Sequence, residues 1–135
     1  VSCSMARITG KAEVVKAALD CIAYQITDLI LAMEQDTGME IEELRVDGGP
    51  TRNQYLMQFQ SDITDKRENI PDAEELSGIG VAYLAGVSAG VYRVDELSGN
   101  IERNIYRPQM DQKIREEKYE GWKRAVSGVL TGCNQ

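Results

Sequence analysis

The residues best suited to chemistry lie in the run from Leu44 to Ile63, LRVDGGPTRNQYLMQFQSDI. Gly48 and Gly49 follow a short apolar stretch, and two adjacent glycines let a backbone approach a ligand because no Cβ intervenes. A helix that begins at Pro50 would direct its free N–H groups outward, where they favour an anion such as phosphate. Asn53 would lie one turn inside that helix and reach back over the glycines. The run therefore predicts a nucleotide-binding turn.

Two plainer interpretations of this turn stay open. Asp47 and Gly48 form an Asp-Gly pair, which also opens many β-hairpins. A helical pattern follows, with apolar residues at Tyr55, Phe59 and Ile63, so a second strand directly after the turn is disfavoured. The other interpretation is a helical interaction domain in which the glycines form only a turn.

Helical spacing of apolar residues predicts the elements that would position the turn. One helix is expected from Lys11 to about Gln35, ended by Gly38, and another from Gln112 to about Leu130, with Trp122 as a packing anchor. The first helix carries its apolar residues on a wide face at Val14, Val15, Ala18, Leu19, Ile22, Ile26, Leu29, Ile30 and Met33.

Shorter elements are expected between these two helices. Strands are predicted at Leu44–Val46, before the turn, and at 66–70, ended by Pro71. Asp72 and Glu75 have the spacing of a capping box and would open a helix rich in small residues, including Gly78, Ala82 and Gly86. Residues 92–107 are predicted to be a loop with one helical turn near Asp95. Alternating helices and strands favour an α/β fold with parallel pairing.

Composition excludes several classes of function. The 135 residues carry a net charge of −7 with a pI near 4.6, which argues against nucleic-acid binding. The chain has no histidine, and Cys3, Cys21 and Cys133 form no CxxC pair, so a structural zinc site and a histidine relay are disfavoured. Free thiols in a reducing compartment are expected. The N-terminal VSCSMARITGK lacks signal-peptide features, and its missing Met suggests a piece of a longer protein.

Four segments of the chain carry a family resemblance. They are the glycine turn with its helix, Glu13–Gln25, Gly78–Gly86, and Tyr106–Met110 together with Tyr119–Lys123. Taken in their order along the chain, they resemble the C-terminal domain of the FGGY carbohydrate kinases, and their sequences are nearest to members that phosphorylate glycerol. Val1–Ile8 does not match the head of the family's second signature.

The resemblance implies a fold class and a domain arrangement. It implies an α/β chain that forms part of an actin-like, ribonuclease H-like ATPase lobe, helix-rich with a small, mostly parallel sheet. Residues 1–135 would be a single domain, the C-terminal part of the lobe. Within it, 1–10 would be a strand or extended remnant, 11–91 a helix-strand-helix-strand-helix core, and 92–135 a loop and a C-terminal helix.

The resemblance also implies an activity. The parent would be an ATP-dependent carbohydrate kinase that phosphorylates a hydroxyl of glycerol or a related sugar or polyol. By position, Gly48, Gly49 and Asn53 would bind ATP or ADP. The chain would carry no catalytic residue and no metal ligand, because the Mg²⁺ ligands and the base belong to the preceding lobe, and alone it would be inactive.

Expected partners follow from the same resemblance. They are a small-molecule substrate and a second copy of the parent, with neither nucleic acid nor membrane, in the cytoplasm. An exposed sheet edge would let the isolated chain self-associate. The alternative function is a non-catalytic actin-like module that binds a nucleotide or a protein.

Overall fold

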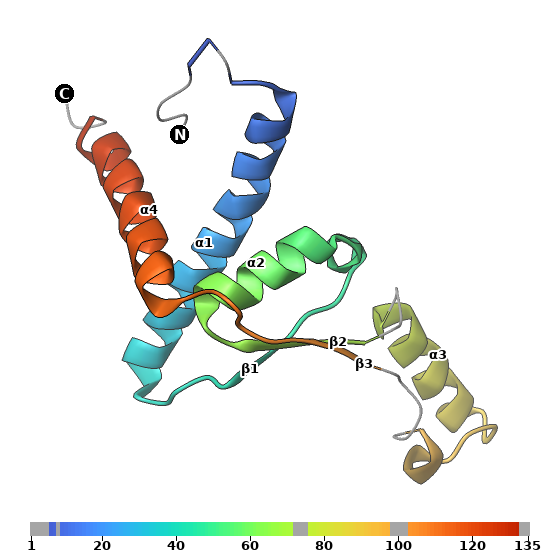
Figure 1. Ribbon diagram of the computed structural model, residues 1–135. Coiled ribbons are helices and arrows are strands. Elements are labelled where there is room, and N and C mark those ends of the chain that lie inside the picture. The colour runs from blue at the N-terminus through green and yellow to red at the C-terminus, as the bar shows by residue number, and fades with distance from the viewer. Residues whose placement is uncertain (1–5, 8, 72–75, 98–102, 133–135) are drawn as a thin grey trace.

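The computed structural model describes residues 6–7, 9–71, 76–97 and 103–132. Within these ranges, most of the helices lie on one side of a small sheet, and one helix lies beyond its end (Figure 1). In chain order the elements are α1 (Lys11–Thr37), β1 (Glu43–Arg45), the 3₁₀ helix η1 (Gly49–Arg52), α2 (Gln54–Thr64), β2 (Arg67–Pro71), α3 (Leu76–Ser88), the 3₁₀ helix η2 (Val94–Glu96), β3 (Arg103–Tyr106) and α4 (Gln112–Gly132).

The sheet has three strands in the order β1-β2-β3. β1 and β2 are parallel, with Leu44 opposite Glu68, whereas β2 and β3 are antiparallel, with Glu68 opposite Tyr106. The helix-rich α/β character is therefore confirmed, but the sheet is mixed rather than mostly parallel. Among the described strands, the outer edges of β1 and β3 have no strand partner.

β3 corrects the prediction of a loop with a helical turn over residues 92–107. The turn is present as η2, but Arg103–Tyr106 is a strand. Its first three residues are exposed and its sequence, RNIY, shows no clear apolar alternation. The segment is held by its hydrogen-bonded ladder with β2, a partner more than 30 residues away, and no local pattern reveals such a pairing.

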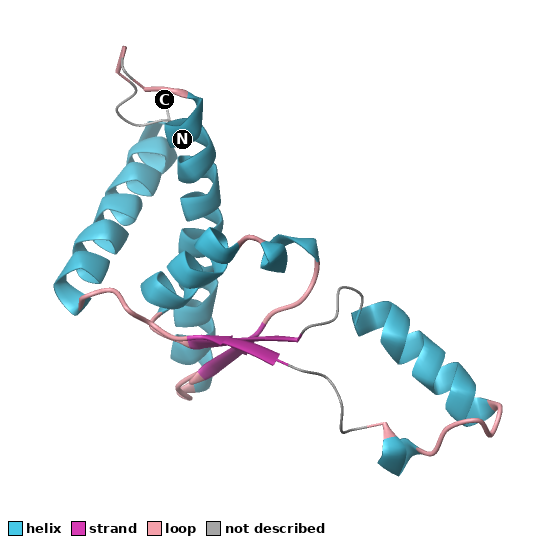
Figure 2. Ribbon diagram, turned by 45° about the vertical axis from the view of Figure 1, so that its right-hand side comes forward, coloured by secondary structure: helices cyan, strands magenta, loops and turns pink. Residues whose placement is uncertain are grey.

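α2 is the central helix of the fold. It packs along α1 and against β2 and β3, and the two ribbon views show it between α1 and the sheet (Figures 1 and 2). Its apolar residues fill the space on both sides. The buried core consists of Ala23 from α1, Leu56, Met57, Phe59 and Ile63 from α2, and Ile70 from β2.

α1 confirms the first predicted helix and ends where Gly38 adopts φ 67°. Its buried residues are Ala23, Thr27 and Ile30, which share one face. The wide apolar face predicted for this helix is only partly buried, because the described elements pack on one side of α1. The predicted face residues that stay exposed include Val14, Val15, Ile22, Leu29 and Met33.

α4 confirms the last predicted helix, and Trp122 packs as expected. The Trp122 ring stacks on Tyr24 of α1 with centroids 5.4 Å apart, and its Nε1 donates to Asp28 Oδ2 at 2.8 Å. Tyr119 donates to the other oxygen of the same carboxylate at 2.6 Å. Helical spacing also predicts that Ile114 and Val129 face inward, but they are 49% and 40% exposed.

Polar contacts to the end of α2 hold the N-terminus of α4. Asp62 Oδ1 accepts from the N–H groups of Gln109 and Met110 at 2.7 and 3.2 Å. Arg115 Nε donates to the Asp62 carbonyl at 2.6 Å, and its Nη2 lies 2.8 Å from Asp65 Oδ1. The loop after β3 is therefore fixed on the helix that carries the core.

α3 lies to one side of the sheet in both views (Figures 1 and 2). Gly86 of α3 packs closely against the loop that follows the helix, since an added Cβ would lie 2.2 Å from Tyr92 Cδ2. The capping box predicted at Asp72 and Glu75 lies outside the described residues, as do residues 1–5. Among the described residues before α1, Thr9 N–H donates to the Ala6 carbonyl at 2.9 Å.

Glu68 of β2 has a carboxyl group in unfavourable, buried surroundings. Its side chain is 0% exposed, and in the described part of the chain no hydrogen bond of good geometry reaches either carboxyl oxygen. Burial raises the pKa of Glu68 to about 7, and the Gln60 side chain on α2 only partly offsets this. Ionised Glu68 is therefore destabilising.

We expect the free energy of unfolding to fall as pH rises. The pKa of Glu68 in the folded state lies above the ordinary value of 4.5. The contribution of protonated Glu68 to stability is therefore complete below pH 4.5 and is lost as pH rises through about 7. The free energy of unfolding should fall by about 3 kcal/mol across that window. Urea unfolding at several pH values measures it, and Glu68→Gln should remove the dependence. A flat pH profile in the unsubstituted chain contradicts the prediction.

Candidate functional site

The glycine turn connects β1 to η1 at the surface. Val46 N–H donates to the Asn69 carbonyl at 3.2 Å, which extends the β1–β2 ladder up to the turn. Since β1 pairs in parallel with β2 and a helix follows the turn, the hairpin interpretation is wrong. Asp47 and Gly49 are exposed.

Gly48 has a backbone conformation that requires glycine. Its φ of 96° and ψ of 174° lie in a region that side chains with a Cβ rarely adopt. The turn is then closed by Thr51, whose N–H and Oγ1 both donate to the Gly48 carbonyl, at 3.1 and 2.7 Å. The backbone of Gly48 therefore shapes the turn.

The start of the following helix differs from the prediction. Pro50 lies in the first turn of η1 rather than at the start of an α-helix. Asn53 lies between η1 and α2, with φ −85° and ψ 94°, instead of one turn inside a helix. Its Oδ1 accepts from Leu56 N–H at 3.1 Å, so Asn53 is the N-cap of α2. Asparagine is among the best N-cap residues, so this preference is the feature of the sequence that indicates the start of α2 at Asn53.

The free donors of the turn also differ from the prediction. The N–H groups of Thr51 and Asn53 are used within η1, so they do not face a ligand. Among described residues, no protein acceptor is bonded to the N–H groups of Gly48 and Gly49 or to Asn53 Nδ2. The structure thus brings the three predicted residues together, with donors that are backbone amides and one side-chain amide.

Gly49 faces open space. An added Cβ there would meet no protein atom within 4 Å, and its φ is not positive. A small molecule could therefore contact the Gly49 backbone directly. The turn therefore presents unused amide donors beside open space.

A cluster beside the turn has no signal in the sequence pattern. Tyr55, the second residue of α2, donates to Asp20 Oδ1 of α1 at 2.5 Å, and Lys16 Nζ lies 2.5 Å from Asp20 Oδ2. Burial and then the hydrogen bond to Asp20 raise the pKa of Tyr55. The pairing joins residues 35 positions apart, so only the packing of α1 on α2 reveals it.

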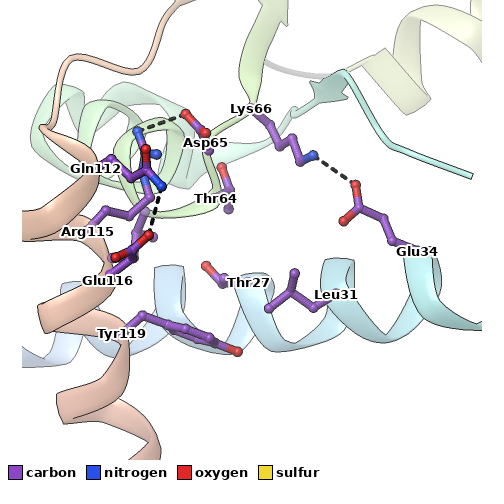
Figure 3. Close-up of a pocket in the computed structure, with 11 residues that line it drawn as sticks. Thr27, Leu31, Glu34, Thr64, Asp65, Lys66, Gln112, Arg115, Glu116 and Tyr119 are labelled. Atoms are coloured by element: carbon purple, nitrogen blue, oxygen red, sulfur yellow. Dashed lines mark hydrogen bonds and ion pairs between the residues drawn. The ribbon is translucent and has the colours of Figure 1, made fainter.

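A cavity of about 400 Å³ opens at the opposite end of α2, between α1 and α4 (Figure 3). Its charged groups pair with one another: Lys66 Nζ is 2.8 Å from Glu34 Oε1, and Arg115 is paired with Asp65. Tyr119 is bonded to Asp28. The cavity is therefore separate from the glycine turn, and its polar groups are largely satisfied by the protein.

The described residues contain no group of three or more His, Cys, Asp or Glu side chains that could hold a metal ion. Over the same ranges, no helix is both long and apolar enough to span a membrane.

Comparison with known proteins gives consistent matches. Residues 2–89 match the family model described as the FGGY family of carbohydrate kinases, C-terminal domain. Glycerol kinase of Pseudomonas fluorescens is 46% identical over 117 residues, covering 84% of this chain and 23% of that protein. Glycerol kinase of Haemophilus influenzae is 42% identical over 129 residues, covering 93% and 25%. The chain thus spans about a quarter of the length of these curated relatives.

Solved structures match over nearly the whole chain. Plasmodium falciparum glycerol kinase with ADP superposes with a TM-score of 0.78 at 30% identity, over 94% of this chain and 26% of that one. A xylulose kinase from Brucella ovis gives a TM-score of 0.73 at 20% identity, over 98% and 28%, a likeness of fold alone. These neighbours have an actin-like ATPase fold, so that part of the fold prediction is confirmed.

The two glycines of the turn should respond differently to alanine. Gly48→Ala should lower the free energy of unfolding by about 1 to 3 kcal/mol, because its backbone conformation excludes a Cβ. Gly49→Ala should change it by less than about 0.5 kcal/mol, because the new Cβ meets open space. Chemical unfolding of both variants measures this, and equal losses would show that the turn has a different conformation.

Proposed function

This chain belongs to the FGGY family of carbohydrate kinases, and from that premise we propose that it forms one wall of the nucleotide site in a kinase of the glycerol-phosphorylating type. The observation that carries the proposal is the exposed turn at Gly48 and Gly49, which has unused amide donors and open space where a side chain would stand. The crystal structure of the Plasmodium falciparum relative contains ADP, which supports a nucleotide as the ligand.

We propose that the three residues have different roles toward ATP or ADP. Gly48 shapes the turn, and the Gly49 backbone lies against the nucleotide. Asn53 uses its Oδ1 to cap α2, which leaves its Nδ2 to donate to the nucleotide. Asp47 only orients the turn.

The reaction needs groups beyond this wall. The acceptor hydroxyl oxygen forms a bond to the γ-phosphorus of ATP, the bond to the ADP oxygen breaks, and the hydroxyl proton passes to a carboxylate base. Mg²⁺ neutralises the phosphates when it is bound. We propose that the base, the metal ligands and the acceptor pocket for glycerol or a related sugar belong to other parts of the parent enzyme. The family match favours this kinase over a non-catalytic actin-like module.

Location and assembly are part of the same proposal. A cytoplasmic kinase would have a supply of ATP and a reducing environment for its cysteines, of which Cys21 is a free thiol. Self-association of the isolated chain would use the outer edge of β1 or β3.

Nucleotide affinity tests the site. In the parent enzyme, Gly49→Val should weaken ADP binding at least about 10-fold, because the added branch fills the space that the ligand needs. Asn53→Asp keeps an oxygen to cap α2 but removes the amide donor and adds a negative charge, and should also weaken binding about 10-fold. Calorimetric titration with ADP measures both changes.

A matched control separates the site from the fold. Gly80→Val adds the same atoms on α3, where a Cβ also meets no atom within 4 Å, and should leave ADP affinity unchanged. Unchanged affinity in both the Gly49 and the Asn53 variants would overturn the site assignment.

The isolated 135-residue chain should not phosphorylate glycerol or related sugars. Phosphoryl transfer depends on aligning donor and acceptor between charged groups, and one wall cannot do this. A coupled assay for ADP release measures the activity, with the parent enzyme as the positive control. Turnover by the chain at ordinary kinase rates of about 1 to 100 per second would refute the proposed division of roles.

A further inference from the structure

The carboxylate of Asp20 joins two helices beside the glycine turn. On α1, Lys16 Nζ lies 2.5 Å from Asp20 Oδ2. From α2, the Tyr55 hydroxyl donates to Asp20 Oδ1 at 2.5 Å. The Asp20 side chain is only 15% exposed, so water competes weakly for these contacts. Both carboxylate oxygens therefore have a fixed partner.

The cluster is anchored in the core of the fold. The Tyr55 ring stacks on Phe59 with centroids 5.9 Å apart and planes 6° apart, and Phe59 is 6% exposed. Lys16 Nζ lies 5.3 Å from the centre of the Tyr55 ring and 5.5 Å from that of Phe59. A cation over these rings further restricts the position of Tyr55.

The position of Tyr55 determines what this link can control. Asn53 is bonded to Leu56 N–H, so it moves with the first turn of α2. Tyr55 lies in that turn, two residues after Asn53. A shift of the Tyr55 end of α2 relative to α1 therefore carries Asn53 and the adjoining Gly49 with it.

We propose that Asp20 is a positioning residue for the nucleotide: by holding the Tyr55 hydroxyl, it fixes where Asn53 and Gly49 meet the ligand. This inference rests on the proposed function, since it assigns a ligand to the turn. A misplacement of about 1 Å in a binding group can markedly weaken its action on a ligand. The Asp20–Tyr55 hydrogen bond thereby contributes to nucleotide affinity without touching the nucleotide.

The chain offers a matched control further along α1, at Asp28. There the Tyr119 hydroxyl donates to Asp28 Oδ1 at 2.6 Å, which joins α4 to α1 with the same pair of groups. Tyr119 adjoins the cavity at the far end of α2 rather than the glycine turn (Figure 3). Removing either tyrosine hydroxyl should loosen the packing of a helix on α1, but only the Tyr55 substitution should change nucleotide affinity.

The test compares Tyr55→Phe with Tyr119→Phe in the parent enzyme. Tyr55→Phe should raise the KM for ATP and the Kd for ADP about 3- to 10-fold, the worth of one hydrogen bond, with kcat and the KM for the acceptor nearly unchanged. Tyr119→Phe should leave all four values unchanged. Asp20→Ala should match Tyr55→Phe, whereas Asp20→Asn, which keeps an acceptor oxygen, should recover most of the affinity.

The outcomes separate this inference from the proposed function. If the unsubstituted parent binds no nucleotide, or if Gly49→Val binds ADP normally, the proposed function fails. If Gly49→Val loses affinity but Tyr55→Phe does not, the positioning role alone is overturned. Equal effects of Tyr55→Phe and Tyr119→Phe on ADP affinity would also overturn it, because they would reflect general loosening. Thermal unfolding of each variant confirms that all measurements are made on folded protein.

Discussion

The burial of α2 between α1 and the sheet is the interaction on which the rest of the structure depends. α2 is buried on both sides through the side chains of Leu56, Met57, Phe59 and Ile63. This is the main stabilising contribution available to so small a chain. Because α2 cannot move independently of the core, whatever is fixed to its ends is held firmly. The glycine turn adjoins one end, and α4 is fastened to the other.

The two ends of α2 are completed by different chemistry. At the N-terminus, Asn53 caps the helix with its Oδ1, and we propose that its Nδ2 donates to the nucleotide. At the C-terminus, the Asp62 carboxylate accepts from the loop before α4, while Arg115 of α4 donates to the Asp62 carbonyl and pairs with Asp65. The C-terminal end is thus satisfied by the protein. Under the proposed function, the same helix serves both as core and as binding element.

The sequence pattern predicted the long helices and the turn because these depend on local spacing. α1 and α4 follow from apolar residues at helical intervals, and Gly48 and Gly49 follow from their backbone freedom. The pattern failed where a distant partner decides the outcome. β3 exists through its pairing with β2, and the link between Asp20 and Tyr55 exists through the packing of two helices.

The boundary at Asn53 was misplaced for a different reason. A proline followed by polar residues suits the first turn of either a 3₁₀ helix or an α-helix, so Pro50 could not distinguish them. The choice depends on the Thr51 bonds to Gly48 and on the Asn53 cap, which are known only from atomic positions.

The apolar residues left exposed along α1 have a consequence for handling the chain in solution. An apolar strip of α1 is exposed to solvent at Ile22, Leu29 and Met33. The net charge of −7 causes electrostatic repulsion between molecules. Salt shortens the reach of that repulsion to about 10 Å at 0.1 M ionic strength and leaves the attraction between apolar surfaces intact. Colloidal stability should therefore be best in dilute buffer and worst near the isoelectric point.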